Sequence, residues 1–187
     1  MANEALEKNL VAVLMQDHAR IRWLFDEVEG ARYDDRRRDA AHELSTLLVQ
    51  HSTAEEMFLY PEVGESLTGG RELASQGLRE HRDLERQLKV WARCKDAAAF
   101  MEQCHHLRDA VLAHIDQEES ELFPALKAAL PVERLHELAI RIEQSERIGP
   151  TRPHPSAPHR PPVNKLIGPG MGIVDHLRDR LAGRRTG

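Results

Sequence analysis

One pattern of residues occurs twice in this chain and limits what the chain can fold into. In one-letter code it reads H-x-x-x-E-E-x-x-x-aromatic-P, and it runs from His51 to Pro61 and again from His114 to Pro124. On an α-helix, residues i and i+4 project from one face, rotated by only about 40°. A histidine and a glutamate at this spacing are predicted to form a pair of metal ligands, and two facing pairs could hold two ions.

Apolar residues recur at helical spacing in four long segments, and strand patterns are nearly absent. These segments span residues 3–29, 36–60, 71–93 and 97–129. Gly30 is predicted to end the first helix, Pro61 to close the second and Asp96 to cap the fourth. Four amphipathic helices with short connections favour an all-α, up-and-down four-helix bundle. A shorter fifth helix is predicted to start at Pro131 and to pack on the bundle.

Residues 1–148 are predicted to form this metal-binding bundle, and residues 149–187 a separate segment. Prolines crowd residues 150–162, which predicts an extended linker. The last apolar residues have the spacing of one short amphipathic helix: Ile173, Val174, Leu177 and Leu181. We expect that helix to dock on its own bundle or on a second subunit. A protein partner or a membrane surface is the alternative.

Each long helix is predicted to carry a histidine in the middle of its apolar stripe, as His18 does between Leu14 and Ile21. The stripes are predicted to continue at Phe58, Leu73, Leu122 and Ala125. Unpaired imidazoles and carboxylates in these positions would cost roughly several kcal/mol apiece, and a bound cation would offset that cost. The second and fourth helices run parallel in such a bundle. His51 and His114 precede their prolines by the same distance, so a single layer of ligands is feasible.

The predicted metal ligands are His18, His51, Glu55, His81, His114 and Glu118. One histidine on an apolar stripe is more often a hydrogen-bonded core residue than a ligand, but four of them, two in repeated patterns, favour a metal. Glu85 and Glu119 are weaker candidates. An i,i+4 ion pair with Lys89 would explain Glu85 equally well. Glu119 faces outward, supports the other ligands or replaces Glu118 as a ligand.

Composition excludes several other classes of protein. The formal net charge of -5 argues against a general nucleic-acid binder. Charged residues interrupt the first helix, so no signal peptide is expected, and no apolar run is long enough for a membrane span. Cys94 and Cys104 are expected to be free thiols in a reducing cytosol, although a redox-sensitive pair across the turn between two antiparallel helices is an alternative. We therefore expect a cytoplasmic protein.

Over about residues 8–130 the chain resembles the hemerythrin-like family of HHE cation-binding domains. The resemblance rests on the two repeated patterns and on the pairs Asp17-His18 and Glu80-His81. It implies a non-haem di-iron site inside a four-helix bundle, in which the four histidines would be terminal ligands. Two carboxylates would bridge the irons, and Glu55 and Glu118 stand at those positions.

The chain departs from the oxygen-carrying members of that family. Those proteins have five histidine ligands, two of them in an H-x-x-x-H pair on the third helix. Here Gly77 stands four residues before His81, so that pair is missing. The carriers use H-x-x-x-x-D on the fourth helix, whereas this chain offers Glu118 four residues after His114. A site richer in carboxylates is harder and more anionic, favours ferric iron and could leave a position open.

The leading hypothesis is a protein that binds, senses or scavenges dioxygen, nitric oxide or peroxide at two iron ions. A second hypothesis is a di-iron enzyme with catalase- or peroxidase-like turnover, or one that donates iron for repair of metal centres. Trp23 and Tyr60 are weak candidates for its proton donor, and no catalytic residue is assigned. A structural bundle that holds zinc is a third hypothesis, but zinc prefers four ligands and this chain offers six or more.

Overall fold

The computed structural model describes residues 9–148, and the side chains as far as residue 144. The predictions for residues 3–8, for the proline-rich segment and for the last amphipathic helix lie outside the described residues. Among the described helices, none combines the length and the apolar character that crossing a membrane requires.

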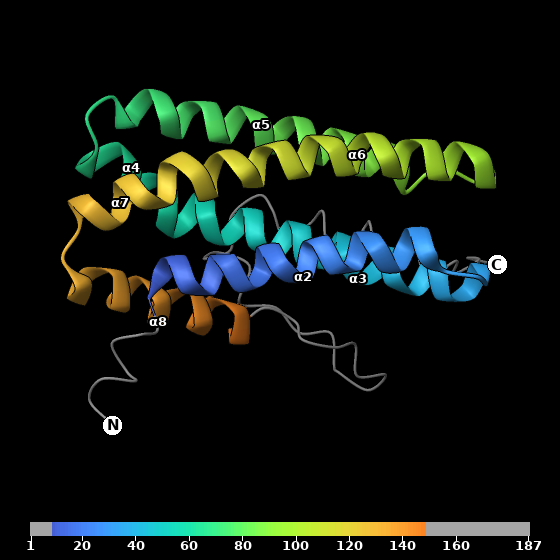
Figure 1. The fold of residues 1–187 in the computed structure, drawn as a ribbon, viewed down its shortest axis with the longest axis horizontal. Helices are drawn as coiled ribbons and strands as arrows, with labels where there is room; N and C mark the ends of the chain where they lie inside the picture. The colour runs from blue at the N-terminus through green and yellow to red at the C-terminus, as the bar shows by residue number, and fades with distance from the viewer. Residues whose placement is uncertain (1–8, 149–187) are drawn as a thin grey trace, which may run out of the picture.

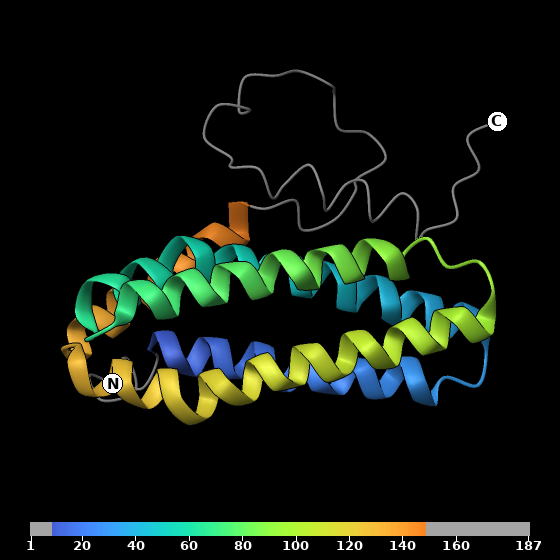
Figure 2. The ribbon, with the colours of Figure 1, turned by 90° about the horizontal axis from the view of Figure 1, so that it is seen from above.

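The described chain forms four long helical rods and a fifth helix (Figure 1). The rods are α2 (Leu10–Gly30); α3 (Asp34–Ala54) with η1 (Glu55–Leu59) and α4 (Tyr60–Ser66); α5 (Gly70–Trp91); and α6 (Ala97–Gln117) with η2 (Glu118–Leu122) and α7 (Phe123–Ala129). The fifth helix is α8 (Val132–Ile148). Consecutive rods pack side by side, and α6 also packs on α2, which closes the bundle (Figure 2). The all-α bundle with a fifth helix is confirmed.

Side chains cap two helices at the positions where the sequence favours a start. Oδ1 of Asn9 accepts a hydrogen bond from the backbone N–H of Ala12 at 3.1 Å. Oδ1 of Asp96 accepts one from Ala99 at 2.9 Å, as predicted for the fourth rod. Each bond satisfies a backbone donor that the first helical turn leaves unpaired.

Pro61 does not end the second rod, contrary to the prediction. In the π-helical turn η1, the backbone N–H of Tyr60 donates to the carbonyl of Glu55. Pro61 then lies in the first turn of α4, where a missing N–H and a fixed φ are tolerated. The rod therefore continues to Ser66. Pro124 is accommodated in the same way after η2.

The π-helical turns also move the buried face of each rod by one residue. Phe58 and Leu122 were predicted to continue the stripes, but both are only partly buried. The next residues, Leu59 and Phe123, are buried instead, with 0% and 1% of their surface exposed. A π-helical turn takes about one residue more than an α-helical turn, so it shifts every later side chain. The α-helical period therefore gave the wrong core residue at each π-helical turn.

Two other predicted core residues, Leu73 and Ala125, are exposed. On α5 the small residues Ala74 and Gly77 face the interior instead, because the Tyr60 ring fills the space beside Gly77. Small residues on an inward face do not contribute to an apolar pattern, so the pattern selected Leu73.

The core consists of two apolar clusters with a polar layer between them. One cluster lies where α4, α7 and α8 meet and includes Leu14 and Leu59. The other lies toward the α2–α3 and α5–α6 turns and includes Ile21 and Trp91. On α2, His18 stands between Leu14 and Ile21 and marks the depth of the polar layer. Cys94 and Cys104 belong to the second cluster and are free thiols.

Helix α8 covers one side of the bundle, where it packs on α2, α3 and η1. Its buried residues Leu135, Leu138 and Ile142 join the first apolar cluster. Arg134 at its start forms an ion pair with Glu62 of α4. This helix therefore covers the apolar residues beside the polar layer on the α2–α3 side.

Two glycines at helix ends should respond to alanine in opposite directions. A Cβ at Gly30 would meet nothing within 4 Å, whereas one at Gly70 would overlap the carbonyl oxygen of Val63. We expect Gly30→Ala to stabilise the fold by about 0.5 kcal/mol through the lower entropy of the unfolded chain. Gly70→Ala should destabilise it by about 2 kcal/mol through overpacking. Thermal unfolding of both variants measures this, and equal shifts would contradict the packing at the α4–α5 turn.

Candidate metal centre

Six predicted ligands from four rods converge in the polar layer. All are buried, with at most 8% of any of them exposed: His18, His51, Glu55, His81, His114 and Glu118. Their ligand atoms form two groups, each within 4.8 Å. The first contains His18, His51, Glu55 and Glu118, and the second contains Glu55, His81 and His114. The geometry therefore offers two adjacent positions for a cation, with Glu55 common to both.

Glu55 divides its two oxygens between the two groups. Oε1 lies 3.2 Å from Nε2 of His51, and Oε2 lies 3.2 Å from Nε2 of His81. Both oxygens are buried and receive no hydrogen bond from the described residues. The contacts at 3.2 Å are ion-pair distances without hydrogen-bond geometry. A buried carboxylate in this state needs positive charge nearby.

The two oxygens of Glu118 also lie beside histidines of different pairs. Its Oε1 lies 3.5 Å from Nε2 of His114, and its Oε2 lies 3.4 Å from Nε2 of His18. Oε2 is a third buried oxygen without a hydrogen bond among the described residues. The two glutamates thus connect the histidine pair on α2 and α3 with the pair on α5 and α6.

Each histidine turns Nε2 toward the centre and Nδ1 toward an outer carboxylate. The Nδ1 partners are Glu119 for His18 (2.9 Å), Asp17 for His51 (3.4 Å), Glu56 for His81 (3.3 Å) and Glu80 for His114 (2.8 Å). An ionised carboxylate only accepts hydrogen bonds, so each Nδ1 carries a proton. This arrangement leaves the Nε2 lone pair free to bind a metal, and it is the usual support for histidine ligands.

The distances between the rings fit a cation. Nε2 of His18 lies 3.1 Å from Nε2 of His51, and the same atoms of His81 and His114 also lie 3.1 Å apart. Two lone pairs at this distance need a shared proton or a cation between them. Two nitrogens at about 2.1 Å from one ion and at right angles to each other would lie about 3 Å apart. The donor set therefore fits a metal in both positions.

Tyr60 also reaches the centre. Its hydroxyl donates to Oε1 of Glu118 at 3.2 Å and lies 3.1 Å from Nε2 of His81. A Cβ at Gly77 would lie 2.5 Å from the tyrosine ring, so the glycine makes room for it. The sequence showed that a histidine is missing at Gly77, but not that a phenol from another rod fills that space. A buried phenol can donate to a bound ligand or act as an oxygen ligand itself.

The charges of the cluster change its proton affinities. Burial disfavours the charged ring of His81, but contacts with Glu55 and Glu56 outweigh burial and raise its pKa to about 9. Burial would raise the pKa of Glu55, but the charge of His51 and the contact with His81 lower that pKa far below its usual range. Burial, with the negative charges of Glu55 and Glu118, raises the pKa of Tyr60. Without a metal, protons therefore supply positive charge to the cluster.

The two weaker candidates lie outside both groups. Glu85 forms an ion pair with Lys89, the alternative that the sequence left open. Oε1 of Glu119 accepts a hydrogen bond from Nδ1 of His18. The same oxygen accepts one from Nη1 of Arg22 at 2.8 Å. The hydrogen bonds from Arg22 keep the pKa of Glu119 below its usual range. Trp23 is half-exposed on the surface of α2 and has no place at the centre.

The sequence did not assign the outer carboxylates to their histidines. The sequence did place carboxylates near the histidines, because Asp17 and Glu80 directly precede the histidines of α2 and α5. However, Asp17 contacts His51, and Glu80 contacts His114, each on the following rod. This pairing between rods depends on how the helices face each other, which a helical period does not specify.

Comparisons with known proteins agree with this arrangement. A model of the hemerythrin HHE cation binding domain matches residues 9–126. A hemerythrin-like protein of Schizosaccharomyces pombe is 27% identical over 170 residues, which cover 90% of this chain and 84% of that protein. A DNA nickase of Nostoc is 30% identical over 144 residues, but the match covers 75% of this chain and only 40% of the nickase.

A solved structure shares the fold. The crystal structure of a hemerythrin HHE cation binding domain-containing protein from Mycobacterium kansasii superimposes with a TM-score of 0.66. The match covers 90% of this chain and 98% of that chain at 22% sequence identity. Similarity at this level of identity supports the helical bundle and says nothing about the activity of this chain.

The raised pKa of His81 predicts how the metal-free protein responds to pH. Stability from its protonated ring is complete below pH 6.5, the ordinary pKa, and is lost as the pH rises through about 9. The lowered pKa of Glu55 adds stability above pH 4.5 that is lost in acid. We expect the metal-free protein to be most stable between these values and to lose up to about 3 kcal/mol by pH 9.

Thermal unfolding between pH 5 and 9 measures this effect. The decline toward pH 9 should be smaller in His81→Gln and unchanged in the control His105→Gln, whose side chain is 60% exposed. A bound cation replaces the protons on the ligands, so metal binding becomes more favourable as the pH rises. The unfolding temperature of the metal-loaded protein should therefore rise over the same pH range. A metal-free protein whose unfolding temperature is constant from pH 6.5 to 9 would contradict the assignment.

Proposed function

Because this chain belongs to the hemerythrin HHE cation-binding domain family, we propose that its buried cluster holds two iron ions. We further propose that these ions bind dioxygen, nitric oxide or peroxide, so that the protein senses or scavenges one of them. The observation that carries this proposal is the position of Glu55. Its Oε1 lies 3.2 Å from Nε2 of His51 in one histidine pair, and its Oε2 lies 3.2 Å from Nε2 of His81 in the other.

In the proposed site, each ion takes two histidines and shares both glutamates. His18 and His51 would hold one ion, and His81 and His114 the other. Glu55 and Glu118 would bridge the two, and their two negative charges would offset part of the charge of the ions. The outer carboxylates Asp17, Glu56, Glu80 and Glu119 would fix the rings so that Nε2 points inward.

The choice of iron rests on the number and kind of donors. Six inward donors, four imidazoles and two carboxylates, exceed the four ligands of a structural zinc site. Mixed imidazole and carboxylate donors suit iron, and two carboxylates favour its ferric state. The phenol oxygen of Tyr60 adds a further hard donor. Zinc at the same ligands is the alternative that metal analysis would reveal.

A di-iron centre would supply the site with redox chemistry and Lewis acidity, and the chain would control access and protons. Apolar residues above and below the polar layer, such as Leu14 and Ile21, exclude water from the two ends of the cluster. The Tyr60 hydroxyl can donate a hydrogen bond to a bound small molecule. With its pKa raised by burial, that hydroxyl keeps its proton near neutral pH.

Peroxide turnover is the second candidate function, and the position of Tyr60 favours it. A proton donor beside the metal is what such an enzyme needs and what reversible binding does not. DNA nicking, named for the Nostoc relative, is not proposed here. The match covers only 40% of that protein, and this chain has a net charge of -5.

Metal content tests the bridging roles. We expect Glu55→Gln and Glu118→Gln to lower the iron content of the purified protein well below two ions per chain, because an amide supplies one neutral oxygen in place of two charged ones. The control is Glu85→Gln, which removes a carboxylate outside both groups and should leave the content unchanged. If both bridging variants keep two irons, the assignment is wrong.

Optical spectra and peroxide consumption separate the two functions. Reduction followed by exposure to air should change the near-ultraviolet absorption of an iron-loaded protein, whereas a zinc protein would stay colourless. If the protein is a peroxidase-like enzyme, Tyr60→Phe should slow peroxide consumption by about 10²-fold at unchanged iron content. Equal rates in Tyr60→Phe and in the parent protein would remove Tyr60 as the proton donor.

A further inference from the structure

The two repeated halves of the bundle bury equivalent surfaces differently. The register that matches His18 with His81 and His51 with His114 follows from equal spacing, since 33 residues separate His18 from His51 and 33 separate His81 from His114. In this register, Leu10, Val13 and Leu14 on α2 correspond to Leu73, Gln76 and Gly77 on α5. Phe58 and Leu59 of the first repeat correspond to Glu121 and Leu122 of the second.

In the first half, this surface is apolar and covered. Leu10, Val13 and Leu14 are buried, with at most 7% of any of them exposed. They belong to the same apolar cluster as Leu135 and Leu138 of α8. The fifth helix thus covers this surface on the side of α2 and α3.

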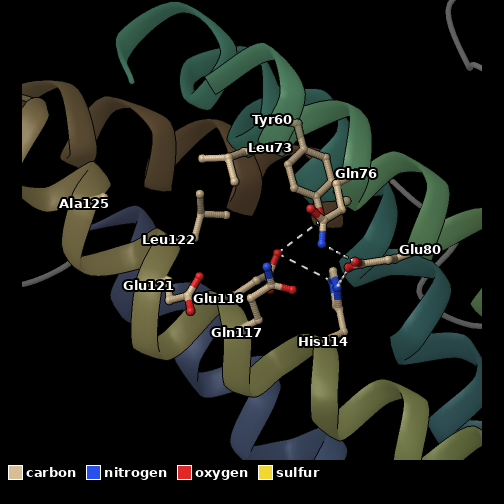
Figure 3. Close-up of a pocket in the computed structure, with 11 residues that line it drawn as sticks. Tyr60, Leu73, Gln76, Glu80, His114, Gln117, Glu118, Glu121, Leu122 and Ala125 are labelled. Carbon is tan, nitrogen blue, oxygen red and sulfur yellow. Dashed lines mark hydrogen bonds and ion pairs between the residues drawn. The ribbon is translucent and has the colours of Figure 1, made fainter. Parts of the chain in front are cut away.

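In the second half, the equivalent surface is less apolar and is open, with Gln76 at the position of Val13 and Glu121 at that of Phe58. A cavity of about 90 Å³ lies there between α5 and the rod formed by α6, η2 and α7 (Figure 3). One water needs roughly 10–15 Å³ in such a measure, so several small molecules fit. Leu73 is 39% exposed at this cavity, although its counterpart Leu10 is fully buried. No described helix covers this side as α8 covers the other.

The cavity ends at the candidate metal centre. Its lining includes Tyr60, His114 and Glu118. Figure 3 shows Tyr60 and His114 both joined to Glu118 by the contacts described above. Farther from His114, Leu73 of α5 lies opposite Leu122. The cavity therefore reaches from the surface to Tyr60 and to two residues of the cluster, His114 and Glu118.

The charges that line this cavity are negative. Glu80 and Glu121 lie in its wall, and its lining contains neither lysine nor arginine. A neighbouring hollow along the same helix seam adds Asp83 and shares Glu80. Carboxylates that line a narrow opening with low-dielectric walls raise the energy of an anion inside it and leave uncharged molecules unaffected.

We propose that this cavity is the entrance through which a small uncharged molecule, such as nitric oxide, dioxygen or hydrogen peroxide, reaches the metal centre. Its acidic lining disfavours anions of the same size. This inference rests on the proposed function, because an entrance has a role only if a metal binds at the cluster. It adds the route and the charge of the ligand, which neither the family nor the cluster specifies.

A bulky residue in the wall tests the route. Ala125 of α7 lines the cavity, whereas Ala128 of the same helix does not, and both are exposed. In the iron-loaded protein we expect Ala125→Phe to slow nitric oxide binding to the reduced form by about tenfold or more, and Ala128→Phe to leave the rate unchanged. Stopped-flow absorption measures both rates. Leu73→Trp repeats the test from the opposite wall.

The charge of the lining is tested separately with azide. We expect Glu121→Gln to accelerate azide binding to the oxidised form by about threefold to tenfold at low ionic strength, an effect that salt should screen. The rate for nitric oxide should not change. Glu102→Gln, which removes an exposed carboxylate of α6 outside the cavity lining, is the matched control. Equal azide rates in both variants would overturn the charge selection.

Two failures can be told apart. If the parent protein binds no iron, the proposed function fails. If it binds iron and nitric oxide, but Ala125→Phe and Leu73→Trp bind nitric oxide as fast as Ala128→Phe, the entrance is overturned and the proposed function stands. Iron content measured for every variant before the kinetics keeps the two results separate.

Discussion

The burial of six ionisable side chains in one layer of an aliphatic bundle is the constraint on which the rest of this structure depends. Glu55 is fully buried, and neither of its oxygens receives a hydrogen bond from the described residues. Such a group is tolerated only with positive charge beside it, and either protonated imidazoles or metal ions can supply that charge. The four outer carboxylates, the two π-helical turns and the apolar clusters on both sides all hold this layer in place.

The repeat makes the centre nearly symmetric, and a few residues break the symmetry. Phe123 stacks on His18 with ring centroids 5.5 Å apart, whereas its counterpart Tyr60 brings a hydroxyl to His81. Helix α8 then covers the half that contains His18, and the other half keeps an open cavity with acidic residues in its wall. A site built from a repeated pattern thus has one covered side and one open side, a difference that a reactive centre can use to admit a ligand from a single direction.

Much of the fold follows from local patterns. The helical stripes located all four rods, and the capping residue Asp96 marked the start of α6 because its side chain satisfies a backbone donor. The stripes failed after Glu55 and Glu118, where Leu59 and Phe123 are buried in place of the predicted Phe58 and Leu122. A π-helical turn leaves no clear mark in an apolar pattern, so a prediction that assumes a constant helical period is displaced beyond it.

The sequence by itself determined the helical bundle, the residue types of the cluster and their spacing along each helix, because helical geometry is local and repeats every few residues. Only the tertiary structure decided which carboxylate supports which histidine, that Tyr60 occupies the space beside Gly77, and which side of the cluster α8 leaves open. These features arise from contacts between rods. Such contacts depend on how the helices rotate and pack against one another, and no single helix carries that information.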